Sequence, residues 1–128
     1  MEPNKVVARC KDGTVLKGTT IDFSPNKKDF HLELLKGEII NIDVEKLKAL
    51  FFVKDFIGDK NRNDIYNDVV PGGGRKIQVK FKDGELLTGY AQSYSPSRLG
   101  FFVIPADIQG NNERIFIINS ATEEVAFL

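Results

Sequence analysis

IQVKFKDGELLTGY, residues 77–90, has the same pattern as VVARCKDGTVLKGT, residues 6–19. In each stretch apolar and polar residues alternate, a Lys-Asp-Gly triplet follows, and a second glycine comes five residues after the first. The offset between Lys11 and Lys82 is 71, and the same offset relates Phe23-Ser24-Pro25 to Tyr94-Ser95-Pro96. A constant offset held over about twenty residues predicts tandem copies of one small domain.

The alternation predicts half-buried strands, because side chains of a strand point to opposite faces in turn. The residues expected to face the core are Val6, Ala8 and Cys10 in the first copy and Ile77, Val79 and Phe81 in the second. Asp-Gly is a strong hairpin signal, since glycine accepts a positive φ. Gly18 and Gly89 interrupt the next strands and predict a bulge or a bend there. The remaining strands are expected at 15–23, 30–35, 39–42 and 48–53, and at 86–94, 101–104, 115–118 and 125–128.

The offset between the copies changes after the third strand of the second copy. Glu45 matches Glu123 and Leu50 matches Leu128, each pair at an offset of 78. The increase from 71 to 78 predicts a seven-residue insertion, which we place in a longer hairpin loop at 105–112. Short turns at 44–47 and 120–124 are expected to lead into the fifth strands.

The order of these elements, with Lys-Asp-Gly followed five residues later by Gly18 or Gly89, resembles the Sm-like family of SH3-like barrels. The fold expected is all-β, with two tandem five-stranded SH3/Sm-like barrels packed together. The first barrel is predicted at 1–56, a polar linker ending in glycines at 57–74, and the second barrel at 75–128. The chain also resembles a group of short uncharacterised bacterial proteins with segments like Ala49–Phe56 and Ser95–Phe102, and no activity comes with that resemblance.

Composition limits the function classes. Lys and Arg together number 18, as do Asp and Glu, so the formal net charge is zero and a polycationic nucleic-acid binder is not indicated. Cys10 is the single cysteine, which precludes an intrachain disulfide and suits a reducing compartment. No apolar run is long enough for a membrane span. These observations predict a soluble cytoplasmic protein.

No set of titratable residues in the sequence converges on an active site. His31, the single histidine, corresponds to Phe102 in the second copy, and Cys10 corresponds to the core residue Phe81. Residues 59–64 begin like a calcium-binding loop but lack its glycine and its final glutamate. Residues 71–75 contain three glycines without the lysine of a phosphate loop. We therefore expect no enzymatic activity, no cofactor and no metal.

Two aromatic doublets, Phe51-Phe52 and Phe101-Phe102, place bulky side chains on both faces of a strand. One face fills the core, and the other has to be covered by the sister copy, the linker or another chain. This favours a non-catalytic binding or scaffold module whose partner is a protein, and it allows a homo-oligomer formed through the aromatic strand faces. The candidate contact residues lie in two cationic Ser-Pro loops: Ser24, Asn26, Lys27, Lys28, Ser95, Ser97 and Arg98.

The sequence leaves two other ligand classes open. Nucleic acid is favoured by a basic stripe on each first strand, formed by Lys5, Arg9, Lys11, Lys76, Lys80 and Lys82. The Asp and Asn that read bases in Sm-like RNA binders are replaced by Ser24 and Asp29, and by Ser95 and Gly100. A cyclic dinucleotide is the weaker alternative: Ser97 and Gly100 keep the spacing of PilZ-type domains, which the segment resembles, but Arg75-Lys76 replaces their paired arginines.

Overall fold

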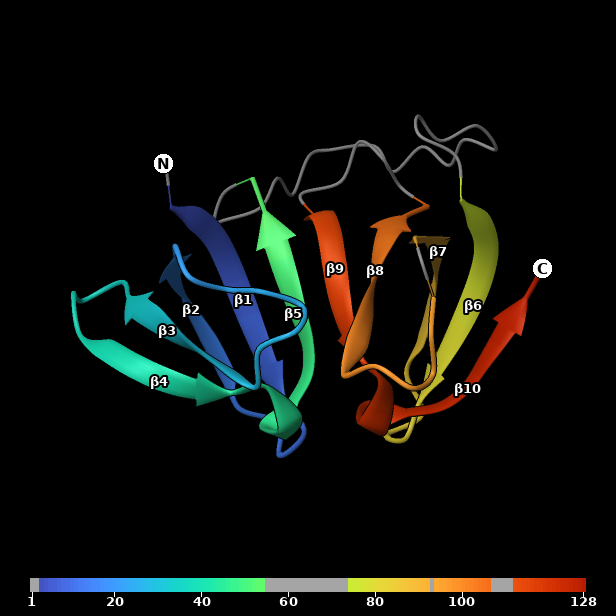
Figure 1. The fold of residues 1–128 in the computed structure, drawn as a ribbon, viewed down its shortest axis with the longest axis horizontal. Helices are drawn as coiled ribbons and strands as arrows, with labels where there is room; N and C mark the ends of the chain where they lie inside the picture. The colour runs from blue at the N-terminus through green and yellow to red at the C-terminus, as the bar shows by residue number, and fades with distance from the viewer. Residues whose placement is uncertain (1–2, 55–73, 93, 107–111) are drawn as a thin grey trace.

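The computed structural model describes residues 3–54, 74–92, 94–106 and 112–128. These residues form ten strands and two single-turn 3-10 helices (Figure 1). No helix within these ranges is long and apolar enough to cross a membrane. The strands are β1 (Asn4–Cys10), β2 (Val15–Thr20), β3 (Asp29–Leu34), β4 (Ile39–Asp43), β5 (Leu47–Val53), β6 (Arg75–Phe81), β7 (Leu86–Gln92), β8 (Gly100–Pro105), β9 (Asn112–Ile118) and β10 (Thr122–Phe127). The 3-10 helices are η1 (Val44–Lys46) and η2 (Asn119–Ala121).

All ten strands belong to one antiparallel sheet in the order β10-β6-β7-β8-β9-β5-β1-β2-β3-β4. We call β1–β5 half one and β6–β10 half two, because each contains the same sequence of neighbours. The expected all-β class is confirmed. The two tandem five-stranded barrels are not confirmed, because β5 pairs with β9 of the other half and the sheet does not close. The predicted linker, residues 57–74, lies almost wholly outside the described residues.

The correspondence between the halves is closer than the sequence comparison indicates. The bounds of β1 and β6 are related by the offset of 71 found in the sequence, and so are those of β3 and β8. Beyond them the backbone corresponds at an offset of 75: the amide of Lys11 donates to the carbonyl of Lys46, and that of Lys82 to the carbonyl of Ala121, both at 2.9 Å. The predicted seven-residue insertion is therefore wrong. The true difference is four residues, and the matches at 78 were coincidences of residue type.

Gly18 and Gly89 mark a close approach of neighbouring backbones. The pairing of β1 with β2 runs through Val6–Gly18 without a register shift, as does that of β6 with β7 through Ile77–Gly89, so of the predicted bulge or bend these pairings show no bulge. A Cβ atom at Gly18 would lie 2.2 Å from the carbonyl oxygen of Glu33, and one at Gly89 would lie 2.6 Å from that of Ile104. Only glycine at these two positions allows β3 to approach β2, and β8 to approach β7, so closely.

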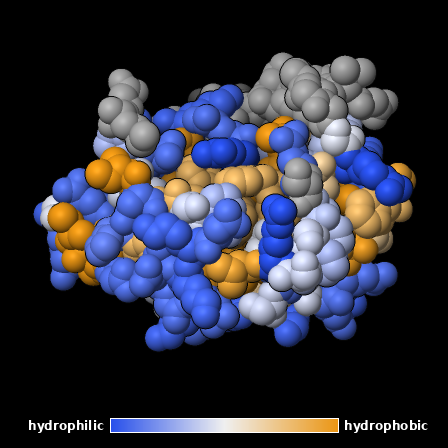
Figure 2. Space-filling view, in the orientation of Figure 1, coloured by the Kyte–Doolittle hydropathy of each residue, from blue (hydrophilic) through white to orange (hydrophobic). Residues whose placement is uncertain are grey.

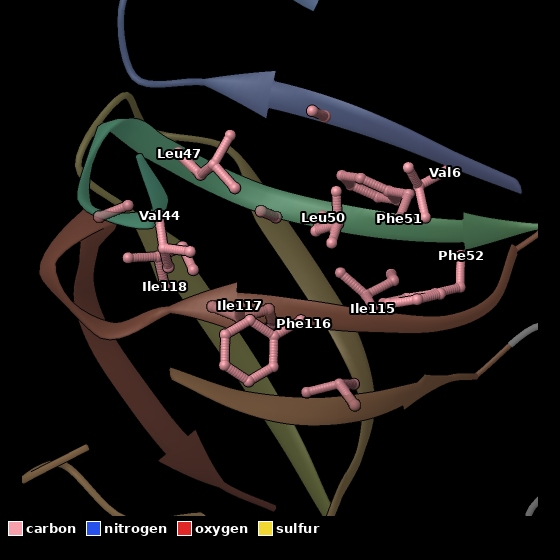
Figure 3. Packing of buried hydrophobic residues seen from close by; sticks show 14 of the residues in the cluster. Val6, Val44, Leu47, Leu50, Phe51, Phe52, Ile115, Phe116, Ile117 and Ile118 are labelled. Atoms are coloured by element: carbon pink, nitrogen blue, oxygen red, sulfur yellow. The ribbon is translucent and has the colours of Figure 1, made fainter. Parts of the chain in front are cut away.

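The hydrophobic core runs without a break through both halves. Val6, Ala8, Ile77 and Val79 are fully buried, as the alternation predicted. All seven residues of β5 are buried, and β5 is paired on both edges, with β1 on one side and β9 on the other. Figure 3 shows β5 side chains facing those of β9 across the middle of the molecule. Cys10 is half-buried, and this burial raises the pKa of its thiol.

We expect Gly18→Ala and Gly89→Ala each to destabilise the fold by about 2–3 kcal/mol, because the added methyl group meets a backbone carbonyl that cannot move aside cheaply. Urea denaturation measures the free energy of unfolding. Glu33→Ala is the matched control, since it keeps that carbonyl but removes an exposed side chain, and it should change stability by less than about 0.5 kcal/mol. Equal stability of the glycine variants and the control would contradict the close approach.

Candidate functional site

The two halves meet where β5 pairs with β9, and we call this pairing with the side chains around it the joint. The joint shows what can occupy an edge of this sheet. Across it the ring of Phe52 lies 6.0 Å from that of Phe102, and Phe23 lies 5.1 Å from Phe116. The guanidinium of Arg114 lies 4.4 Å from the centre of the Phe52 ring and 4.7 Å from that of Phe102. The strand face of the aromatic doublets that does not fill its own core is thus covered by the other half. The sister copy is one of the three possibilities that the sequence left open.

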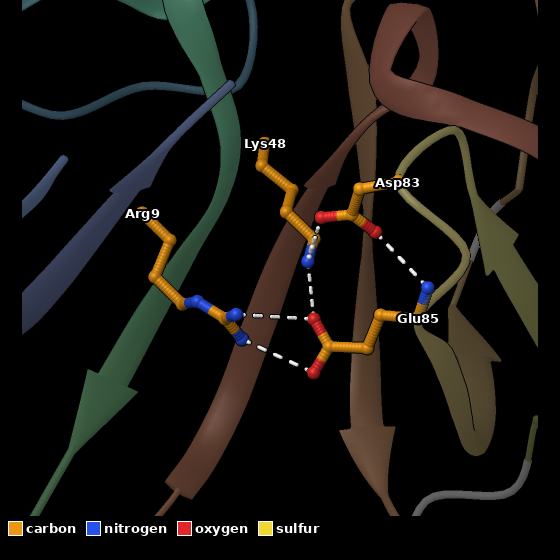
Figure 4. Close-up of polar contacts among 4 residues, drawn as sticks. All are labelled: Arg9, Lys48, Asp83 and Glu85. Atoms are coloured by element: carbon orange, nitrogen blue, oxygen red, sulfur yellow. Dashed lines mark hydrogen bonds and ion pairs between the residues drawn. The ribbon is translucent and has the colours of Figure 1, made fainter. Parts of the chain in front are cut away.

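A charged cluster holds the other end of the joint (Figure 4). The ammonium group of Lys48 donates to Asp83 Oδ2 at 2.7 Å and also to Glu85, and the guanidinium of Arg9 pairs with Glu85 at 3.1 Å. The Lys48 side chain is only 6% exposed and lies against the ring of Phe81 at 4.7 Å. The hydrogen bond from Lys48 lowers the pKa of Asp83. Burial acts to raise the pKa of Glu85, but the hydrogen bonds from Lys48 and Arg9 outweigh it.

This cluster changes the meaning of the predicted basic stripes. Arg9 is engaged by Glu85, Lys11 donates to the hydroxyl of Ser120 at 2.6 Å, and Lys80 lies 3.6 Å from Glu123. Carboxylates beside a cation reduce the positive potential that attracts phosphates. The other stripe residues, Lys5, Lys76 and Lys82, are exposed. Nucleic-acid binding by the stripes stays a prediction, with less free charge than the sequence suggested.

The two Ser-Pro loops form the same turn in each half. The amide of Lys27 donates to the carbonyl of Ser24 at 3.1 Å, and that of Arg98 to the carbonyl of Ser95 at 3.3 Å. Ser24 and Ser95 are half-buried at the start of these turns. The residues that follow them, Asn26, Lys27, Lys28, Ser97 and Arg98, are exposed. The structure therefore presents these side chains to solvent, and their role in binding a partner stays a prediction.

The joint has an uncovered counterpart at the outer end of half one. There β4 corresponds to β9, and within the described residues β4 has a neighbour on one side only, β3. Beside it lies a groove of about 510 Å³, which we call the β4 groove. Ile21 and Ile39, on its walls, are 66% and 63% exposed. Figure 2 shows hydrophobic surface at this end of the sheet. The groove is lined by Pro3, Thr19, Thr20, Ile21, Asp22, His31, Glu33 and Ile39.

The two halves differ in sequence at the places where β9 is covered by β5 and, in the described residues, β4 has no second strand beside it. The face of half two that receives Phe23 and Phe52 contains Phe102 and Phe116, whereas the equivalent places in half one hold His31 and Asn41. Half one thus has the exposed Ile39 on its edge strand, and it has polar residues where half two has the half-buried ring of Phe102 and the buried ring of Phe116. The β4 groove was missed by the sequence analysis, although the His31–Phe102 mismatch was its signal.

His31 forms part of one wall of the groove. Its Nδ1 lies 2.7 Å from Asp22 Oδ2, and its backbone amide donates to Asp22 Oδ1 at 3.0 Å. The side-chain hydrogen bond with His31 is the main reason why the pKa of Asp22 falls to about 2. The hydroxyl of Thr20 donates to Asp22 rather than to the histidine, so the three side chains do not form a nucleophile–base–acid relay. The hydrogen bonds between Asp22 and His31 fix the orientation of the imidazole in the groove wall.

The described ranges contain no group of three or more His, Cys, Asp or Glu side chains that could hold a metal ion. Comparison with known proteins shows that the chain belongs to DUF6982, a family of unknown function, whose sequence model matches residues 2–128. No curated protein and no solved structure matches the chain.

We expect Asp22→Asn to reduce the difference in the free energy of unfolding between neutral and acidic pH. Because the pKa of Asp22 is about 2 in the folded chain against 3.8 ordinarily, its carboxylate stabilises the fold above pH 3.8, and this contribution is lost as the pH falls towards about 2. Urea titrations at neutral pH and at the lower end of that window measure the effect. The variant should be less stable than the parent at neutral pH and approach it in acid. A constant difference between the two proteins across the window would contradict the assignment.

Proposed function

We propose that this protein is a non-catalytic binding or scaffold module that takes an extended strand of a protein partner along β4 and the β4 groove. In this proposal the two halves are tandem copies of an open SH3/Sm-like barrel. One observation carries it: inside the chain β5 fills the edge and face beside β9, while in the described residues the equivalent edge of β4 has no strand beside it and the β4 groove lies next to it. The internal joint is thus an example of the binding mode.

The backbone of β4 is suited to accept a strand. An edge strand presents unpaired amides and carbonyls to which an extended peptide can add, and side-chain pockets then supply specificity. Natural edge strands are commonly protected by lysine or proline. β4 reads Ile-Ile-Asn-Ile-Asp and contains neither, and its first residue, Ile39, is exposed.

The groove indicates the kind of side chain that the partner inserts. In the internal joint Phe52 lies opposite Arg114 and fills the space against Phe102. The corresponding space in half one is bounded by Ile39 and His31, with the carboxylate of Asp22 holding the imidazole in place. An aromatic or large aliphatic side chain would bury Ile39, and a polar group beside it could reach His31 or Glu33.

A peptide copy of β5 tests this proposal. The probe is the capped peptide KLKALFFVK, which repeats residues 46–54. Added to the isotopically labelled protein, it should shift the backbone amide signals of β4, together with those of Ile21 and His31, in a saturable manner. Its control is the same peptide with aspartate in place of the residue that copies Phe52, and this peptide should bind at least about tenfold more weakly because it loses the buried ring.

Three results would contradict the proposal. The first is an unchanged spectrum for β4, and the second is equal binding of the two peptides. The third is a set of shifts confined to the Ser-Pro loops at Ser24 and Ser95, which would move the binding site to those loops.

A further inference from the structure

The exposed hydrophobic residues are concentrated at the two outer edges of the sheet. Of the large hydrophobic side chains that are exposed in the described residues, only Val15 and Leu86 lie elsewhere. Those near β4 are Ile21, Leu35 and Ile39, and those on or just after β10 are Phe127 and Leu128. β4 and β10 are also the two end strands in the order of the sheet. Within the described residues, both ends therefore present apolar surface beside an edge that has no strand partner.

β10 is the counterpart of β5, the strand that fills the internal joint. In half one the ring of Phe23 lies 5.7 Å from that of Phe52, and in half two Tyr94 lies 5.7 Å from Phe127 at the equivalent place. The same arrangement thus positions Phe52 and Phe127. Their surroundings differ, because Phe52 is 4% exposed under the other half and Phe127 is 43% exposed.

We propose that the strand taken up by β4 is β10 of a second copy of this chain, a proposal that rests on the function proposed above. The internal register pairs Phe51 with Ile115 and Phe52 with Arg114. Transferred to the equivalent residues of β10 and β4, this register pairs Ala126 with Ile40 and Phe127 with Ile39 of the second copy. Phe127 then enters the β4 groove beside Ile39.

Such a joint is heterologous, because one copy contributes β10 and the other contributes β4. After each association one β4 and one β10 remain available, so copies add head to tail until a ring closes or a filament grows. Blocking one edge of a molecule leaves its other edge competent. This property distinguishes the proposed joint from a symmetric dimer.

The polar end of the joint is less favourable between copies than inside the chain. Glu123 takes the place of Lys48, and Asp12 takes the place of its acceptor Asp83. Two carboxylates thus approach each other where the chain itself has an ion pair, and the charges of Lys80, 3.6 Å from Glu123, and of Lys46, which acts on Asp12, offset this only in part. The association between copies is therefore weaker than the internal joint and reversible with concentration.

Sedimentation velocity over low-micromolar to near-millimolar concentrations tests the proposal. The parent protein should grow in mass with concentration. Ile39→Asp blocks β4 and Phe127→Asp blocks β10, and each variant alone should stay monomeric. An equimolar mixture of the two should form a species of two chains and nothing larger, since one intact β10 and one intact β4 remain. Leu86→Asp, at an exposed site away from both edges, is the matched control and should assemble like the parent.

Two further variants sharpen this test. Glu123→Lys restores the cation of the internal cluster opposite Asp12, and it should lower the concentration for half-assembly about tenfold. Leu128→Asp is a second block of β10 if Phe127→Asp does not fold, as judged by its circular dichroism spectrum. A monomeric parent at every concentration, a mixture that stays monomeric, or assembly by either blocked variant alone would overturn the proposal.

The peptide KLKALFFVK separates this inference from the proposed function. Phe127→Asp retains an intact β4, so the peptide should shift its β4 amides as in the parent. If the peptide binds there while the parent protein is monomeric at every concentration, the second copy is the wrong occupant and strand binding stands. If neither the peptide nor a second copy engages β4, both proposals are wrong.

Discussion

Every residue of β5 is buried, and β9 from the other half of the chain pairs along its second edge and brings the apolar side chains of that half against it. Each half has about 50 residues, near the size at which a domain stops being able to bury enough apolar surface by itself. The joint overcomes that shortage by making one core from two. Phe52 and Phe116 fill its middle, and the buried Lys48 is neutralised by Asp83 at one end. This pairing joins the two halves into one sheet and leaves β4 and β10 as the end strands of the described residues.

The local elements of the fold could be predicted because their causes are local. Alternation located β1 and β6, and the Asp-Gly turns, with Gly13 and Gly84 both at φ +95°, located the hairpins that follow them. The joint could not be predicted in this way, since nothing in the pattern of β5 says which strand lies beside it. The insertion length failed for a related reason. The alignment paired residues of the same type, such as Glu45 and Glu123, whereas the backbone hydrogen bonds define which positions of the two halves correspond.

The candidate site was harder to predict, because it depends on which of two equivalent strands, β4 or β9, has a second strand beside it in the described residues. His31 looked like an ordinary strand residue in isolation. Its meaning comes from the comparison with Phe102, which occupies the same position on a covered face. Lys48 gives the same lesson at the other end of the joint. A single cation in the apolar run of β5 signals a buried ion pair, but the partners Asp83 and Glu85 lie in the other half and cannot be read from the run itself.

Native-state hydrogen exchange with increasing urea tests most directly whether the β5–β9 joint unites the two halves. If it does, the amides of β5 and β9 exchange slowest, and they exchange with the same free energy of opening, because neither half can unfold while the other keeps its core. Exchange in which β9 opens at a clearly lower free energy than β1 and β5, with half two losing protection before half one, would contradict the account.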